Sequence, residues 1–98
     1  MNDLIADLSA LVPGASILVS VNRQQNGSPF CDASVFPLPD GFVENDHGNY
    51  FDPSSWSITL ASDGTAHLHV YRYHDTDVVA AVREARDLLR GWIVEGVA

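Results

Sequence analysis

The spacing of apolar residues predicts a helix near each end of the chain. Apolar residues recur every three or four positions through residues 4–11, and Pro13-Gly14 then ends the pattern. Residues 76–95 show the same spacing over a longer stretch, with a cap expected within 75–77 and Asn2 as the cap of the first helix. The apolar stripe of the second helix comprises Val78, Val82, Ala85, Leu89 and Ile93, with Leu88 and Trp92 beside it.

A period-two pattern predicts two strands after the first helix. Apolar side chains alternate with others over about residues 15–22, which is typical of a half-buried strand. Asn26-Gly27 is a strong turn signal, and residues 30–36 resume a strand-like composition, so we expect a hairpin. Which face of the second strand is buried stays open, because neither alternate set of residues in FCDASVF is uniformly apolar.

The pattern between Trp56 and Tyr73 predicts a second hairpin and indicates its register. A two-residue turn at Asp63-Gly64 would mix polar and apolar side chains on both faces. A three-residue loop over 62–64, with Gly64 in the left-handed conformation, sorts the faces cleanly. It pairs Ile58 with Leu68, Trp56 with Val70 and Thr59 with His67. The buried face then carries Trp56, Ile58, Leu60, Leu68 and Val70, and the opposite face carries Ser57, Thr59, His67, His69, Tyr71 and Tyr73.

Residues 37–54 predict a long connection without regular structure, because they are rich in Pro, Gly, Asn and Asp. A connection of this length in a compact domain is often functional. Its apolar side chains could fix it to the body of the domain or cover the polar face of the sheet; they are Phe42, Val43, Tyr50 and Phe51.

Together these elements predict an α+β fold in a single compact domain, residues 1–98. We expect a small antiparallel sheet of about four strands. The N-terminal helix and the long C-terminal helix pack on one face of it, which leaves the other face open.

Composition indicates a cytoplasmic protein with no membrane association. The hydrophobic fraction of 46% is typical of a folded domain, yet no apolar run is long enough to span a bilayer. Asp3 and Asp7 stand where a secretory signal carries Lys or Arg. Cys31 is the only cysteine, so no internal disulfide can form.

The charge is strongly negative and unevenly distributed. Thirteen acidic residues face five cations, all of them arginine, for a net charge of −8. Eight of these acids lie in residues 1–70, where Arg23 is the only cation. Such a chain repels phosphate, which argues against direct nucleic-acid binding, and attracts a basic protein instead. The absence of lysine suggests GC-rich coding and hence a bacterial or phage source.

Three arginines form a basic stripe along one flank of the C-terminal helix. They are Arg83, Arg86 and Arg90. Asp87 lies within helical reach of Arg83 and of Arg90, so we expect it to pair with both in a solvated ion-pair face.

His67 and His69 are the leading candidates for chemistry, because both imidazoles project from the same face of one strand. A zinc site needs a third ligand, and acid–base catalysis needs a neighbouring carboxylate. The candidates for the third ligand are His47, His74 and Asp75, and those for the carboxylate are Asp46 and Asp75. No sequence spacing brings any of them close, so we predict no metal, no cofactor and no catalytic residue.

No other motif completes a site. The carboxylates of segment 37–54 lack the spacing of an EF-hand, and the glycines lack the context of a phosphate-binding loop. Cys31 lies in a half-buried strand and is expected to be a core thiol.

These observations favour a small, acidic, non-enzymatic binding protein. Its expected target is a basic or nucleic-acid-binding protein, which it would inhibit in the manner of an immunity factor, a phage anti-defence protein or a nucleic-acid mimic. The predicted partner-binding residues are Asp40, Glu44, Asp46, Asp52, His67, His69, Tyr71 and Tyr73. The alternatives are a small His-dependent or metal-dependent enzyme using His67 and His69, and a structural subunit that forms a homodimer through the open sheet face.

Overall fold

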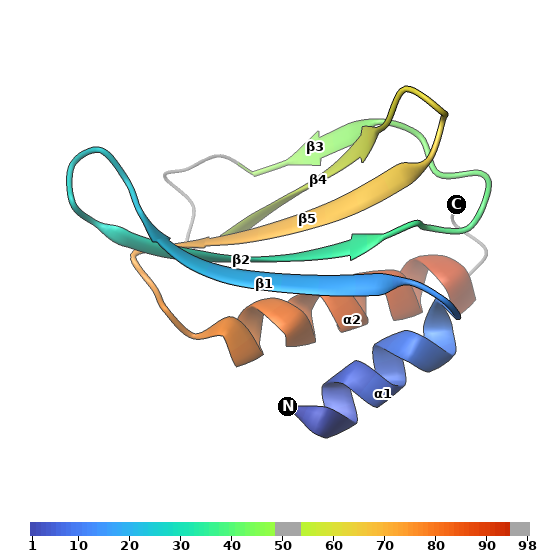
Figure 1. Cartoon of the computed structure of the whole chain (residues 1–98), viewed down its shortest axis with the longest axis horizontal. Helices are drawn as coiled ribbons and strands as arrows, with labels where there is room; N and C mark the ends of the chain where they lie inside the picture. Colours follow the sequence, from blue (N-terminus) through green and yellow to red (C-terminus); the bar gives the residue numbers. More distant parts are fainter. Residues whose placement is uncertain (49–53, 95–98) are drawn as a thin grey trace.

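The computed structural model describes residues 1–48 and 54–94, which form two helices and five strands (Figure 1). Along the chain the elements are α1 (Asn2–Leu11), β1 (Ser16–Arg23), β2 (Pro29–Phe36), β3 (Asn45–His47), β4 (Ser54–Leu60), β5 (Ala66–Tyr73) and α2 (Val78–Val94). Neither helix is both long enough and apolar enough to cross a membrane.

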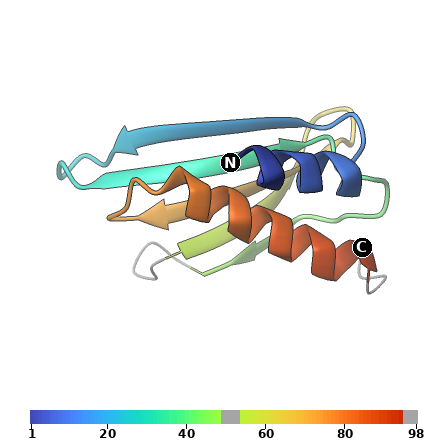
Figure 2. The same ribbon diagram turned by 90° about the horizontal axis from the view of Figure 1, so that it is seen from below.

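The strands form one antiparallel sheet in the order β1-β2-β5-β4-β3. Both helices lie on the same face of this sheet, as the two views in Figures 1 and 2 show. The expected α+β fold, with its helices on one face, is confirmed. The sheet has five strands where about four were expected. The additional strand, β3, lies in the segment expected to be irregular, and its three polar residues are too few to show an alternating pattern.

The register expected for the β4–β5 hairpin is confirmed. Ile58 pairs with Leu68, and Gly64 adopts the left-handed conformation, with φ +86°. The β1–β2 hairpin closes in the same way, with Gly27 at φ +86°. In each loop the residue before the glycine accepts a backbone N–H two positions further on: Asn26 Oδ1 from Ser28, and Asp63 Oδ1 from Thr65, both at 2.9 Å.

The structure settles which face of β2 is buried. Cys31, Ala33 and Val35 are completely buried beneath the helices, and the residues between them lie on the opposite face. These side chains are small, so α2 can pack closely over the centre of the sheet. Burial raises the pKa of the Cys31 thiol, which keeps it protonated, as suits a core residue.

Helix α2 buries the apolar stripe expected from the sequence. Val82, Ala85 and Leu89 are fully buried against the sheet. Asp77 caps the helix, because its Oδ1 accepts the backbone N–H of Ala80 at 3.1 Å. The cap expected for α1 is wrong: the N-cap position is Met1 rather than Asn2, and it makes no side-chain capping bond.

Ion pairs join the two helices to each other. Asp7 of α1 lies 3.3 Å from Arg86 Nη1 and 3.5 Å from Arg90 Nη2. The pairing expected for Asp87 is therefore corrected, because Asp87 contacts its neighbour Arg86 at 2.9 Å rather than Arg83 or Arg90. The expectation considered helical spacing alone, whereas the packing of α1 against α2 supplies a different acid.

The connection between β2 and β3 joins the core. Leu38 and Phe42 are buried on the side of the helices, with the Phe42 ring 6.0 Å from that of Trp92. Val43 is exposed, and Tyr50 and Phe51 lie outside the described residues. Leu60 was expected in the core but is 41% exposed, because it lies at the end of β4 beside the hairpin loop.

Replacing Leu68 by alanine tests the position of the core. Leu68 is completely buried at the centre of the sheet, so Leu68→Ala is expected to lower the free energy of unfolding by about 2–5 kcal/mol. Leu60→Ala is the matched control, with an expected loss of no more than about 1 kcal/mol. Urea unfolding of both variants measures the difference; equal losses would contradict this assignment of the core.

Candidate interaction surface

A ladder of aromatic rings runs along the middle of the open sheet face. His67, His69, Tyr71 and Tyr73 project from β5, and all are half-buried. The centroids of successive rings lie 6.2, 6.2 and 6.5 Å apart. Both helices lie on the opposite face, so no described helix covers this ladder. The face expected for these four residues is the one that they occupy.

Two phenylalanines of β2 extend the ladder at its ends. Phe36 stacks on His67 with ring centroids 4.8 Å apart, and Phe30 lies 6.4 Å from Tyr73. Sequence reasoning missed both, because the buried face of β2 could not be assigned. Their spacing of six residues in one strand, which places them on the same face, was the available signal.

His69 is held by hydroxyl groups from the strands on either side. Ser34 Oγ lies 2.9 Å from Nδ1, and Thr59 Oγ1 lies 3.2 Å from Nε2. Burial, followed by the influence of His67, lowers the pKa of His69. The ring is therefore neutral at pH 7, and both of its nitrogens already have hydrogen-bond partners.

The structure does not bring the candidate third ligands to the two histidines. His47 pairs with Trp56 and stacks on it, so it lies on the helix side of the sheet. Asp75 follows β5 and binds Arg72. Among the described residues, no group of three His, Cys, Asp or Glu side chains is placed to hold a metal ion.

Two carboxylates flank the ladder, one on each side. Asp46 of β3 pairs with Ser57, which places it in the same row of the open face as His69. Asp32 of β2 lies opposite Tyr71 and accepts a hydrogen bond from Ser20 Oγ at 2.7 Å. Asp46 was expected from the sequence, whereas Asp32 was missed together with the register of β2.

The other predicted acids that the structure describes lie outside the strands of the sheet. Asp40 and Glu44 are exposed in the segment before β3, and Asp40 lines a hollow of about 330 Å³ near Asp63 in the β4–β5 loop. Asp52 lies outside the described residues. The acids that flank the ladder are thus Asp32 and Asp46.

All five arginines lie away from the open face. Arg23 is at the end of β1, where it donates to the carbonyl oxygen of Gly27. Arg72 shares the helix side of the sheet with its pairing neighbour Cys31, and the other three belong to α2. Burial also raises the pKa of Tyr71, so its phenol is neutral. The open face therefore combines two carboxylates with the neutral rings of His69 and Tyr71.

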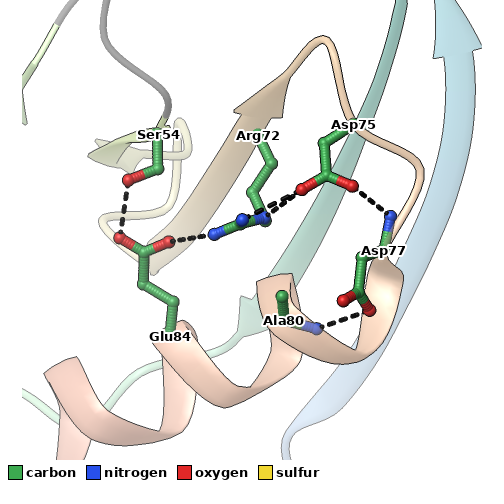
Figure 3. Close-up of polar contacts among 6 residues, drawn as sticks. All are labelled: Ser54, Arg72, Asp75, Asp77, Ala80 and Glu84. Carbon is green, nitrogen blue, oxygen red and sulfur yellow. Dashed lines mark hydrogen bonds and ion pairs between the residues drawn. The ribbon is translucent and has the colours of Figure 1, made fainter.

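A second polar cluster joins β5, β4 and α2 (Figure 3). Arg72 contacts Asp75 through Nε at 3.0 Å and Nη2 at 2.9 Å, and its Nη1 lies 3.8 Å from Glu84. Ser54 donates to the other oxygen of Glu84 at 3.0 Å, and Asp75 accepts the backbone N–H of Asp77 at 2.8 Å. Hollows of about 470 and 490 Å³ adjoin this cluster. Because every charged group of the cluster lies within ion-pair or hydrogen-bond distance of another residue of the cluster, we assign it to stability.

Acidification tests the environment of His69. Folding lowers the pKa of His69, so the unfolded chain binds the proton more readily than the folded protein. The stability that neutral His69 contributes is therefore fully present above about pH 6.5, and it declines as pH falls through that value toward the folded pKa. His69→Gln removes this titration, so its free energy of unfolding should decline less on acidification. His74→Asn, at an exposed position, should decline as the unaltered protein does. Urea unfolding across this pH range measures both, and equal declines for all three proteins would refute the assignment.

Removing the arginine of the second cluster tests its structural role. Arg72→Ala leaves Glu84 and Asp75 without their cation, so the urea midpoint should fall. Arg83→Ala removes an exposed arginine of α2 and should leave the midpoint unchanged. If both variants unfold at the same urea concentration, the cluster contributes no stability.

Comparison with protein-family models, curated proteins and solved structures finds no match to this chain.

Proposed function

We propose that this protein is a small, acidic, non-enzymatic binding protein that covers a basic surface of another protein. Its target class is a basic or nucleic-acid-binding protein, which it inhibits by occupying the surface that would otherwise bind a polyanion. The observation that carries the proposal is the open face itself, where an aromatic ladder lies between Asp32 and Asp46 and every arginine lies elsewhere.

The chemistry of this face fits arginine and lysine side chains. An arginine guanidinium stacks favourably on tyrosine and binds a carboxylate through two parallel hydrogen bonds. Tyr71 supplies the ring, and Asp32 and Asp46 supply the carboxylates on either side of it. In this arrangement the carboxylates take the place of phosphates, which is how a protein imitates a nucleic acid.

The size of the face suits one modest protein interface. Five strands spaced about 4.8 Å apart span roughly 19 Å, and the eight-residue strands β1, β2 and β5 are each roughly 26 Å long, whereas β3 has only three residues. The resulting area of at most about 500 Å² lies below the roughly 800 Å² that each partner contributes to a standard interface, so it suits a small one. The net charge of −8 would also speed encounter with a cationic partner.

The arrangement gives less support to an enzyme. A general base needs a nitrogen free to accept a proton from substrate, whereas both nitrogens of His69 contact hydroxyl groups of neighbouring strands. The carboxylate of Asp75, which could have tuned a histidine, is engaged by Arg72. We therefore favour binding over catalysis at this face.

Affinity capture from a lysate of the source organism or its host, at low and high salt, tests the proposal. We expect a basic protein that is retained at low salt and released at high salt. The double variant Asp32→Asn/Asp46→Asn should bind that protein about tenfold more weakly, and Tyr71→Ala should show a loss of similar size. Isothermal titration calorimetry with the captured protein gives these ratios.

A control with the same change in charge separates a site from a general effect. Asp3→Asn/Asp63→Asn removes two charges from positions outside the open face, on α1 and in the β4–β5 loop, and should change the affinity by less than about twofold. If both double variants and Tyr71→Ala bind as the unaltered protein does, the open face is not the binding surface.

A further inference from the structure

The outer edge of β1 is a long strand edge without a neighbour in the described part of the chain. β1 is the first strand in the sheet order, and it spans eight residues, Ser16–Arg23. The opposite edge of the sheet is β3, which has only three residues and carries Asp46. A short, charged edge resists pairing with another chain, whereas a long, uncharged edge invites it.

The outward backbone groups of β1 belong to alternate residues, which the hairpin identifies. Gln24 donates to Ser28 O at 2.8 Å and accepts from Gly27 N at 2.9 Å, so its N–H and C=O both point toward β2. Direction alternates along an antiparallel strand. The N–H and C=O groups of Ile17, Val19 and Val21 therefore point outward, away from β2.

The side chains of the same three residues form an apolar row on the helix side of the sheet. Their pairing partners in β2 are the buried residues Val35, Ala33 and Cys31. Val19 is nevertheless 44% exposed and Val21 is 53% exposed. Figure 2 shows the reason, since α1 does not extend to the end of β1 that enters the β1–β2 loop.

The usual protections of an edge strand are absent from residues 16–22 of β1. Residues 16–22 contain no charged residue and no proline. The pairing of β1 with β2 runs from Ser16 to Arg23 without a bulge. Natural proteins use these devices to keep free edges apart, so their absence over such a length points to an edge that is used.

We infer that β1 pairs antiparallel with β1 of a second copy of this chain, centred on Val19. In this register Val19 lies opposite Val19 of the second copy, and Ile17 lies opposite Val21 of the second copy. The outward groups then face each other in three residue pairs, each able to exchange two hydrogen bonds. The exposed valines gain apolar neighbours at the same time.

The sequence around Val19 makes the strand complementary to itself. On the helix side the row is Ile17, Val19 and Val21, so every pair across the contact is apolar. On the other side Leu18 pairs with Ser20 of the second copy, and Ser16 pairs with Asn22 of the second copy. If the two strands were shifted by one residue, the outward N–H and C=O groups of one strand would face residues of the other strand whose groups point inward. A shift of the centre to Ser20 would place Arg23 against the apolar Ile17.

Charge also favours this edge for contact between copies. Two chains with a net charge of −8 repel each other, and that repulsion is weakest where neither presents a carboxylate. The resulting dimer would have one continuous sheet of ten strands, with both pairs of helices on one side and both open faces on the other. The inference does not depend on what the open face binds.

Light scattering after size-exclusion chromatography tests the inference over a range of protein concentrations. The unaltered chain of 10.6 kDa is expected to reach about twice that mass as concentration rises. Val19→Lys places two ammonium groups opposite each other at the centre of the pairing and should give the monomer mass. Val43→Lys adds the same charge at a residue that is 68% exposed in the segment before β3, and should remain dimeric.

Amide hydrogen exchange of the unaltered protein gives a second, independent readout. The N–H groups of Val19 and Val21 should be protected in the dimer and should lose that protection on dilution. A monomer at all concentrations, or a Val19→Lys variant that is folded and dimerises as Val43→Lys does, would overturn the inference. The inference would also be overturned by a dimer in which the amides of Val19 and Val21 exchange as freely as those of a solvent-exposed edge, because the contact would then lie elsewhere. This result is obtained on the unaltered protein, so it holds even if Val19→Lys fails to fold.

Discussion

The packing of α2 across β2 and β5 is the interaction on which the rest of the structure depends. It is possible because β2 presents only Cys31, Ala33 and Val35 to the helix, so the helix can lie close over the centre of the sheet. α1 then extends the same layer and is joined to α2 through Asp7. Since both helices occupy one face, the other face has to be stable in water without a helix over it, and its mixture of rings, hydroxyls and carboxylates meets that requirement.

The same division separates the charges. On the helix side three arginines have acidic neighbours, since Arg72 lies beside Asp75, and Arg86 and Arg90 lie beside Asp7. On the open side Asp32 and Asp46 have no arginine in their rows. Two of the uncompensated carboxylates therefore lie where aromatic contact area is also available. Composition alone could indicate that the chain is acidic, but only the sheet order shows that Asp32 and Asp46 share the open face with the aromatic rings.

The sequence predicted the elements whose pattern is local. The β4–β5 register followed from Gly64 and the alternation on each side of it, and α2 followed from its apolar stripe. Features that depend on neighbours far along the chain could not be found. The two faces of β2 are hard to tell apart in the sequence, because Cys31 and Ala33 on the buried face are small, while the opposite face combines phenylalanines with Asp32 and Ser34; the choice of face therefore depends on β1, β5 and α2. The acid that binds Arg86 and Arg90 lies in α1, far away in sequence. Asp32, Phe30 and Phe36 were missed for the first of these reasons.

The hydroxyl groups around His69 have one more consequence. A hydroxyl can either donate or accept a hydrogen bond, so Ser34 and Thr59 suit a proton on Nδ1 as well as one on Nε2. The imidazole can therefore reverse the direction of its dipole while every heavy atom stays in place. Because that reversal also turns the hydroxyl groups of Ser34 in β2 and Thr59 in β4, the centre of the open face has two patterns of donors and acceptors on a single rigid framework. A surface of this kind can match the hydrogen-bonding groups of what lies on it by moving protons, without the entropy cost of rearranging side chains.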